Sequence, residues 1–174
     1  MFESGEPLFV EGESQFPSGP RWLETWLVPL KGGSGEVASV QGISRDITER
    51  KSVARELQES EAKYRTLFDQ ASDGIMLMAV DGSSRMFNES FARMHGYGSP
   101  AEMERLRLED IDTPETAQLA PERLRRMLAG ETLRFEVEHR RKDGQTIALQ
   151  VSCSVIRIGE RPFFLGFHQD ITEH

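Results

Sequence analysis

The sequence predicts an α+β protein in which a five-stranded antiparallel sheet carries short helices on one face. A linker helix and three further strands, which belong to a truncated first copy of the same unit, precede this sheet. Three observations predict the organisation: the tetrapeptide Asp-Ile-Thr-Glu occurs twice, strand-forming and helix-forming segments follow one order, and a long segment without Gly or Pro separates two β-rich parts. Helices are expected on the sheet because its apolar face must be covered.

The repeated tetrapeptide stands at 46–49 and at 170–173, an offset of 124 residues. At this offset seven of the fifteen positions from 35 to 49 are identical, and the strand-forming segment 22–30 falls on 146–154. An internal repeat indicates that the chain contains copies of one structural unit. We therefore assign 1–45 to the C-terminal strands of a truncated copy, 46–68 to a connecting helix and 64–174 to a complete copy.

The composition excludes several classes of function. The formal net charge is −8, so we expect no nucleic-acid partner, because phosphate binding needs a basic surface. No run of about 18 apolar residues is present, and Met1 is not followed by a secretory signal, so we expect no membrane contact by this segment. The single cysteine, Cys153, excludes an internal disulfide. We expect a cytoplasmic location, which is compatible with a membrane-anchored parent protein.

The first copy contains only strands. Aromatic and branched residues at 22–28 predict a strand, and the Gly-rich segment 31–35 predicts a hairpin turn before the next strand, 36–43. The mixed segment 7–15 completes three antiparallel strands. Since no helix accompanies them, one apolar face of this sheet is expected to be bare.

The connecting helix is predicted over 47–68, where residues with high helix propensity dominate. Asp46 can cap this helix, and Glu49 lies three residues on, as in a capping box. Apolar residues along it follow the 4-3-4-3 spacing of a coiled-coil seam, so we expect a homodimer through this helix and through surfaces of the complete copy. A helix that packs on its own domain has a similar stripe, and that alternative stays open. The seam consists of Val53, Leu57, Ser60, Tyr64 and Leu67.

The complete copy combines two strands, several short helices and a three-stranded meander. Asp81-Gly82 predicts a hairpin turn, Asn88 a helix N-cap, Pro121 a first helical turn and Gly130 a helix C-cap. We expect the first and last strands to be neighbours at the centre of the sheet. The predicted elements are strands 74–80 and 85–87, helices 89–95, 101–106 and 122–129, and strands 133–140, 147–155 and 163–171.

The order and spacing of several short motifs resemble a PAS domain with its C-terminal PAC motif. The motifs are Tyr-Arg-Thr-Leu-Phe at 64–68, Asp-Gly-Ile at 73–75, Asp-Gly at 81–82, Phe-Asn-Glu-Ser-Phe at 87–91, His-Gly-Tyr at 95–97, Arg-Arg-Lys-Asp-Gly at 140–144 and the two Asp-Ile-Thr-Glu exits. The resemblance covers 61–174, and 1–50 resembles the last three strands of a preceding PAS domain. It implies a PAS-like fold for the five-stranded sheet.

The resemblance also implies a function. Tandem PAS modules sense a ligand, a cofactor state or a partner, and pass the signal along a helix to a downstream output domain. We expect the signal-sensing and signal-transmitting part of a bacterial sensor histidine kinase, in a two-component phosphorelay. The alternatives are a ligand-free dimerisation spacer and the regulatory part of a diguanylate cyclase.

No constellation for catalysis or metal binding is evident. Cys153 lies in a strand with apolar parity and has no basic context to lower its pKa. His95, His139, His168 and His174 lack the spacing of metal ligands, and His139, which shares its parity with two apolar residues, is expected to be a partly buried sheet histidine. We therefore expect no enzymatic activity and no metal.

The resemblance also implies which cofactors the chain could hold. Flavin-binding members carry a Gly-Arg-Asn-Cys-Arg-Phe-like motif, which is absent from this sequence. Haem-binding members that use an axial histidine carry it on the helix before the meander, and the corresponding helix here, 121–129, has no histidine. Met127 of this helix could approach a haem iron, but we interpret it as a core methionine. We expect neither cofactor, while an unknown small molecule stays possible.

Two sets of site residues follow. A pocket between helices and sheet is expected, with close packing without a void as the alternative. Its candidate lining residues are Ile75, Leu77, Phe87, Phe91, Met94, Met127, Phe135, Val151, Cys153 and Phe167. The candidate signal-transmission residues at the two exits are Asp46, Thr48, Glu49, Asp170 and Thr172.

Overall fold

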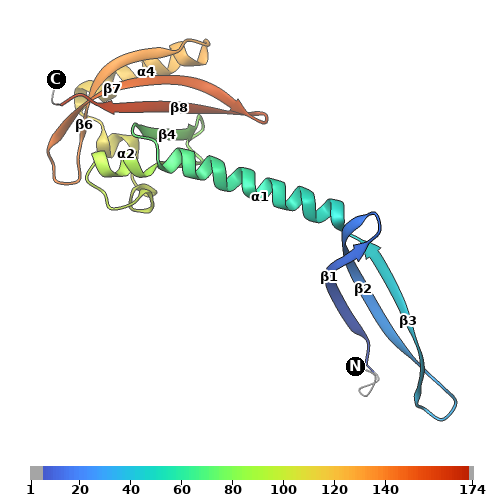
Figure 1. Cartoon of the computed structure of the whole chain (residues 1–174). Coiled ribbons are helices and arrows are strands. Elements are labelled where there is room, and N and C mark those ends of the chain that lie inside the picture. Colours follow the sequence, from blue (N-terminus) through green and yellow to red (C-terminus); the bar gives the residue numbers. More distant parts are fainter. Residues whose placement is uncertain (1–5, 173–174) are drawn as a thin grey trace. The chain divides into compact units, whose positions relative to one another are not determined.

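The computed structural model describes residues 6–172, so Glu173 and His174 lie outside the described residues. The chain divides into two compact units between Lys63 and Tyr64, and each unit contains one antiparallel sheet (Figure 1). This boundary falls inside helix α1 (Thr48–Asp69), which starts in the first unit and ends in the second. The predicted helix 47–68 is therefore confirmed to within one residue.

The first unit contains a three-stranded sheet and the first part of α1. Its strands, in the order β1-β2-β3, are β1 (Leu8–Phe16), β2 (Gly19–Lys31) and β3 (Val37–Asp46). Phe9, Trp26 and Ile43 stand opposite one another in the strand register, and their exposed fractions are 51%, 42% and 59%. The expectation of a bare apolar face on this sheet is confirmed.

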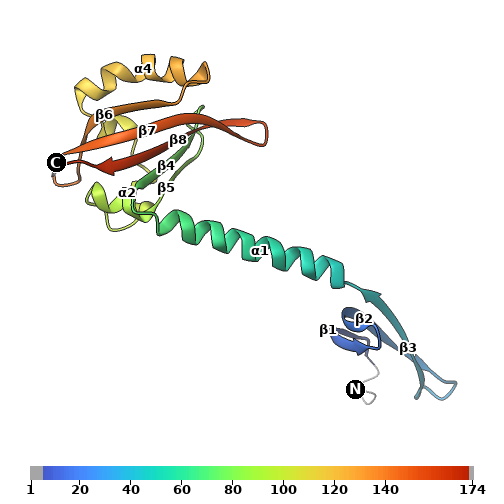
Figure 2. The same cartoon turned by 45° about the horizontal axis from the view of Figure 1, so that its top comes forward.

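The second unit contains the five-stranded sheet in the order β5-β4-β8-β7-β6. The first and last strands of the unit, β4 and β8, are neighbours, as predicted from the sequence (Figure 2). The elements are β4 (Gly74–Ala79), β5 (Arg85–Phe87), α2 (Glu89–Met94), the 3₁₀ helix η1 (Pro100–Met103), α3 (Leu108–Ile111), α4 (Pro114–Leu128), β6 (Leu133–Arg140), β7 (Thr146–Ile158) and β8 (Arg161–Asp170).

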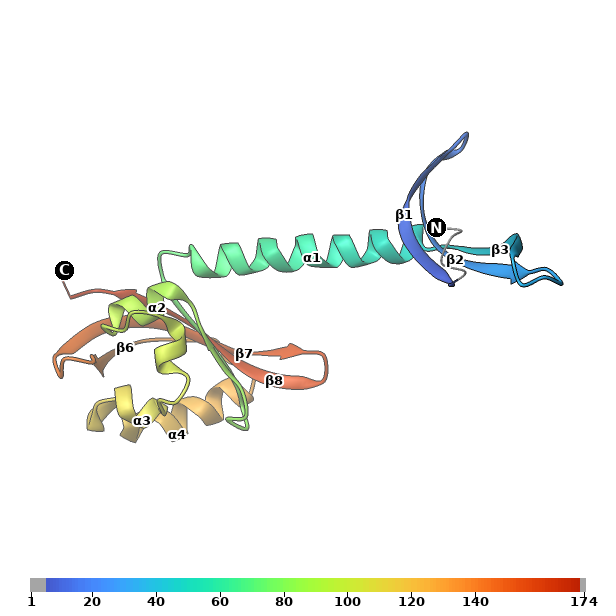
Figure 3. The same cartoon turned by 90° about the horizontal axis from the view of Figure 1, so that it is seen from below.

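The helices of the second unit cover the apolar face of its sheet. Helix α2 packs on β4, and α4 packs on β6 and β7, with α3 and α4 together on one side of the sheet (Figure 3). Alternate residues of β6 and β7 are buried, which is the period-two pattern of a sheet covered on one face. Val137, Leu149 and Val151 are among the residues that form the core beneath α4.

The helices depart from the sequence prediction in two places. Helix α4 begins at Pro114 rather than at 122, with Thr113 as its N-cap, so Pro121 lies inside the helix. Proline is well placed at the first turn of a helix, and Pro114 takes that position instead of Pro121. The predicted helix 101–106 is replaced by the 3₁₀ helix η1, and α3 forms where no helix was predicted.

Asn88 ties three elements together. Its Oδ1 accepts hydrogen bonds from the amides of Ile75 (2.8 Å) and Phe91 (2.9 Å), so it caps α2 as predicted. Its Nδ2 donates to the carbonyls of Phe68 (2.9 Å) and Asp73 (3.0 Å). Because Asn88 is fully buried, these four bonds hold the end of α1, the start of β4 and the start of α2 together.

We expect Asn88→Ala to lower the free energy of unfolding by roughly 2–4 kcal/mol, because it removes a helix cap and leaves a buried strand amide unpaired. Denaturant unfolding of the variant measures this loss. Thr113→Ala, which removes the N-cap of α4, is the matched control and should cost about 1 kcal/mol. Equal losses in the two variants would contradict the special role of Asn88.

Candidate functional site

A cavity of about 580 Å³ lies in the second unit between α4 and the inner face of the sheet. Most of its lining is apolar, and Met76, Met78, Leu124 and Met127 contribute thioether and aliphatic side chains from β4 and α4. Methionine side chains are flexible and adapt to irregular shapes, so a wall of this kind tolerates ligands of different outline. The volume is typical of sites that bind small organic molecules.

Four of the ten predicted lining residues border this cavity: Met127, Phe135, Val151 and Cys153. The predicted parity of the two central strands was wrong. On β4 the cavity takes Met76 and Met78 instead of Ile75 and Leu77, and on β8 it takes Phe164 and His168 instead of Phe167, which is 41% exposed. β4 is non-polar throughout, and β8 is non-polar without interruption over 162–167, so alternation does not distinguish the two faces in these segments.

The other three predicted residues lie beside the cavity without bordering it. Phe87 and Phe91 stack at a centroid distance of 4.9 Å in a second apolar cluster with Met103 and Ile111. Met94 packs against the core cluster beneath α4. The structure thus places them in the packing around the site.

Three buried histidines from three elements meet around Phe91. His95 follows α2, His139 lies on β6 and His168 on β8, and their exposed fractions are 0%, 5% and 3%. The Phe91 ring lies 4.3 Å from the ring centroid of His95 and 4.9 Å from that of His168, and the His139 and His168 centroids are 5.7 Å apart. His139 and His168 border the cavity.

Sequence reasoning considered these histidines singly. His139 was expected to be a partly buried sheet histidine, and the structure buries it more completely, with 5% of the residue exposed. His95 and His168 are 73 residues apart in the chain, and only the packing of α2 against the sheet brings them together. No local pattern predicts such a contact.

Burial keeps the three imidazoles neutral. It lowers the pKa of His95, it lowers the pKa of His139 to about 2 with a further contribution from the neighbouring histidines, and it lowers the pKa of His168 to about 4. Burial also raises the pKa of the Asp112 carboxyl to about 6. Asp112 Oδ1 lies 3.5 Å from His139 Nε2, but the neutral imidazole makes this a polar contact rather than an ion pair.

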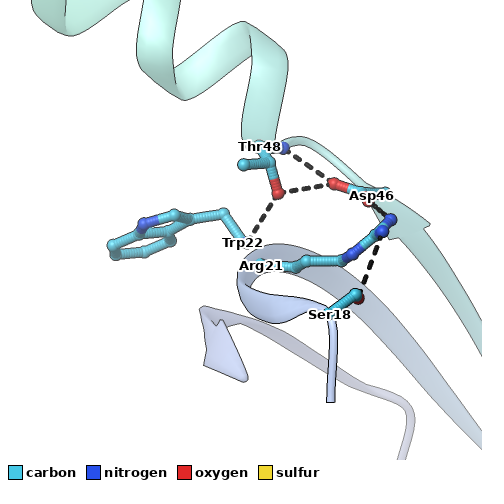
Figure 4. A network of polar contacts seen from close by, with 5 residues as sticks. All are labelled: Ser18, Arg21, Trp22, Asp46 and Thr48. Atoms are coloured by element: carbon cyan, nitrogen blue, oxygen red, sulfur yellow. Dashed lines mark hydrogen bonds and ion pairs between the residues drawn. The ribbon is translucent and has the colours of Figure 1, made fainter. Parts of the chain in front are cut away.

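The joint between β3 and α1 forms a network of hydrogen bonds (Figure 4). Asp46 Oδ1 accepts from the Thr48 amide (2.9 Å) and hydroxyl (2.6 Å), and Asp46 Oδ2 accepts from Arg21 at 2.8 Å. The Thr48 hydroxyl accepts in turn from the Trp22 amide at 2.9 Å. The bonds from Thr48 lower the pKa of Asp46 to about 2. Asp46 thus bonds two residues ahead, so the predicted capping box with Glu49 was wrong.

The second exit repeats this joint. Asp170 Oδ1 accepts from the Thr172 amide (2.9 Å) and hydroxyl (2.6 Å), and these bonds lower the pKa of Asp170. The Ile171 amide donates to the carbonyl of Ala148, as the Ile47 amide donates to that of Trp22.

The preceding strands correspond at an offset different from the predicted one. Leu23 pairs with Asp46 and Leu149 with Asp170, which is a difference of 126 for the strand against 124 for the tetrapeptide. The predicted correspondence of 22–30 with 146–154 was therefore wrong by two residues. The segment from Leu23 to Asp46 is two residues longer than the segment from Leu149 to Asp170. The pairing of β2 with β3 contains a register shift at Leu30/Lys31.

Within residues 6–172, no group of three His, Cys, Asp or Glu side chains is arranged to hold a metal ion. None of the helices in this part of the chain is long and apolar enough to cross a membrane. The candidate functional features are an apolar cavity with a few polar groups and two joints in which a carboxylate binds the residues that follow a strand.

Comparison with protein families assigns both units. A PAS domain model matches residues 72–173, and a second model, of the PAS fold, matches residues 1–52. The first match covers more than half of the chain. The chain belongs to the PAS domain family and contains tandem copies, as the repeated exits indicated.

Three relatives are sensor proteins. The methyl sulfide methyltransferase-associated sensor of Methanosarcina acetivorans is 31% identical over 67% of this chain and 12% of its own length. The sensor protein FixL of Bradyrhizobium diazoefficiens is 25% identical over 88% of this chain and 31% of its length. The sensor histidine kinase TmoS of Ectopseudomonas mendocina is 28% identical over 66% of this chain and 12% of its own length. The chain thus spans less than a third of the length of each relative.

A solved structure shows the same fold. The PAS domain of an HTR-like protein from Haloarcula marismortui matches 70% of this chain and 99% of its own, with a TM-score of 0.58 and 24% identity. The predicted PAS-like α+β fold is confirmed.

We expect the free energy of unfolding to fall as the pH is lowered from 7 to 5. Unfolded histidines titrate near 6.5 whereas the folded cluster stays neutral, so stability present above that pH is lost as unfolding takes up protons. The folded state takes up at most one proton in this range, on Asp112, whose pKa is raised. The unfolded state takes up as many as three, on the histidines, so the loss of stability is only partly offset. Thermal unfolding at several pH values measures the slope. His139→Gln should make the slope smaller, and an unchanged slope would contradict this account.

Proposed function

We propose that this chain is the signal-sensing and signal-transmitting part of a bacterial sensor histidine kinase. The observation that carries the proposal is that one strand borders the cavity and ends at a joint. Phe164 and His168 of β8 line the cavity, and Asp170 follows two residues later. A ligand that displaces these side chains acts on the strand whose end is fixed by the Asp170–Thr172 bonds.

Transmission through the joint requires two discrete arrangements, and a ligand shifts their populations only by binding one more tightly. In the proposed mechanism, Asp170 and Thr172 couple β8 to an output helix. Asp46 and Thr48, with Glu49 in the first turn of α1, do the same for the first copy. The recurrence of the same hydrogen bonds at both exits supports this common role.

The kinase output is inferred from the sensor histidine kinase TmoS and from the other sensors that resemble the chain. In this proposal the chain itself has a regulatory and not an enzymatic role. The proposed ligand is a small organic molecule rather than flavin or haem. Cys153 is buried on a strand, where burial raises the pKa of its thiol to about 11 and so disfavours a reactive thiolate.

A homodimer through α1 is also proposed. The apolar seam residues of this helix are exposed within the single chain, so they are available to a second copy. The exposed fractions are 59% for Val53, 68% for Leu57, 69% for Tyr64 and 61% for Leu67. Pairing two such seams in a coiled coil removes apolar surface from water at about 25 cal/mol per Å².

We expect Asp170→Ala to uncouple ligand from output, because it removes the acceptor that fixes the strand end. Ligand-dependent autophosphorylation of the full-length kinase measures this coupling, and Asp46→Ala should weaken coupling from the first copy. Asp143→Ala is the control, because Asp143 Oδ1 also accepts from the amide two residues ahead, that of Gln145, in the hairpin turn between β6 and β7. Unchanged coupling in a folded Asp170→Ala protein would refute the mechanism.

We expect Leu57→Glu to weaken dimerisation at least about tenfold, because a charge replaces an apolar side chain in the seam. Sedimentation or light scattering over a concentration series measures the equilibrium. Gln58→Glu adds the same charge to the neighbouring position outside the seam and should leave the dimer intact. Dimers of equal strength in both variants would place the interface elsewhere.

A further inference from the structure

We propose that the cavity recognises a neutral, mainly apolar molecule through a hydroxyl or N–H group that the molecule donates to His139 Nε2 and Asp112. This inference rests on the proposed sensory function and names the class of ligand. It follows from the hydrogen-bonding capacity of a chain of buried groups that ends at the cavity.

The hydrogen bonds that start at the Phe91 carbonyl determine which nitrogen of His95 and of His139 carries the proton. The Phe91 carbonyl, 2.8 Å from His95 Nδ1, is only an acceptor, so His95 Nδ1 carries a proton. In a neutral imidazole His95 Nε2 is then an acceptor. His139 Nδ1, at 2.9 Å, must donate to it. The remaining nitrogen, His139 Nε2, therefore holds a lone pair and no proton.

This lone pair meets a second acceptor. Asp112 Oδ1 is 3.5 Å away, and an ionised carboxylate has no proton to donate. The two side chains are only 6% and 14% exposed, and both border the cavity. Two largely buried acceptors that face each other without a donor between them are destabilising, so the pair is matched to a group that donates to one or both.

His168 is a third imidazole next to this pair. Its Nδ1 is buried and makes no hydrogen bond to the described residues. Its side chain lines the cavity, and its ring lies beside that of His139. At the polar end of the cavity, His139 Nε2 and Asp112 Oδ1 are therefore the two acceptors that a ligand can satisfy.

The charges around this end favour a neutral ligand. Arg123 of α4 borders the cavity, with its guanidinium 3.8 Å from the Phe135 ring centroid, and disfavours a cation. Asp112 and Glu109 disfavour an anion. Thr116, which also faces the cavity, already donates its hydroxyl to the Glu138 carbonyl. An aromatic or aliphatic body with one hydroxyl or N–H, as in a phenol or an indole, satisfies these conditions.

The test compares near-isosteric probes with and without the donor: p-cresol with p-fluorotoluene, and indole with indene. Binding to the purified 174-residue chain is measured by calorimetry or ligand-observed NMR. For the wild-type chain we expect the donor probe of each pair to bind about tenfold more tightly. In Asp112→Asn the amide itself can donate to His139 Nε2, so the preference should shrink to about threefold or less.

Asp69→Asn removes the same charge at the end of α1, away from the cavity, and should keep the preference. Equal binding of donor and donor-free probes by the wild-type chain, as expected if water satisfies the acceptors, would overturn the inference. So would the absence of binding by all four probes. Both results leave the coupling through Asp170 to be judged by its own experiment.

A second readout does not depend on any ligand or variant. Nitrogen-15 NMR of labelled histidine reports which ring nitrogen carries the proton. Protons on Nδ1 of both His95 and His139 would support the inference, and a proton on His139 Nε2 would overturn it.

Discussion

Strand β8 is the constraint on which the second unit depends. It is hydrogen-bonded along both edges, to β4 on one side and to β7 on the other, so it cannot shift without disturbing its neighbours. The same strand presents Phe164 and His168 to the cavity and ends at Asp170. Because the same strand lines the cavity and ends at the exit, a displacement of its cavity side chains also acts on the position of Asp170.

The sequence contains enough local information to predict most of the framework. The repeated tetrapeptide, the Asp-Gly turns and the Asn88 cap locate the strands and the start of α2 because each of these signals acts within a few residues. The start of α4 was misplaced because Pro114 and Pro121 are both acceptable as a first helical residue, and Thr113 decides between them through its bond to Thr116.

The cavity was harder to predict than the framework. On β6 and β7 polar residues alternate with apolar ones, so Phe135 and Val151 were assigned to the correct face. On β4 and β8 the apolar residues are continuous, and the face of each side chain is set by the neighbouring strands. The histidine cluster depends on contacts between segments far apart in the chain, which no local pattern contains.

Pro121 lies in the middle of α4 and borders the cavity, and so does Ala117 one turn before it. A proline nitrogen carries no hydrogen, so the carbonyl of Ala117 loses the bond that a helix normally supplies from four residues on. The helix that covers the cavity therefore lacks one backbone hydrogen bond at the turn from Ala117 to Pro121. Bending α4 at that turn breaks one backbone hydrogen bond fewer than bending it elsewhere along the helix.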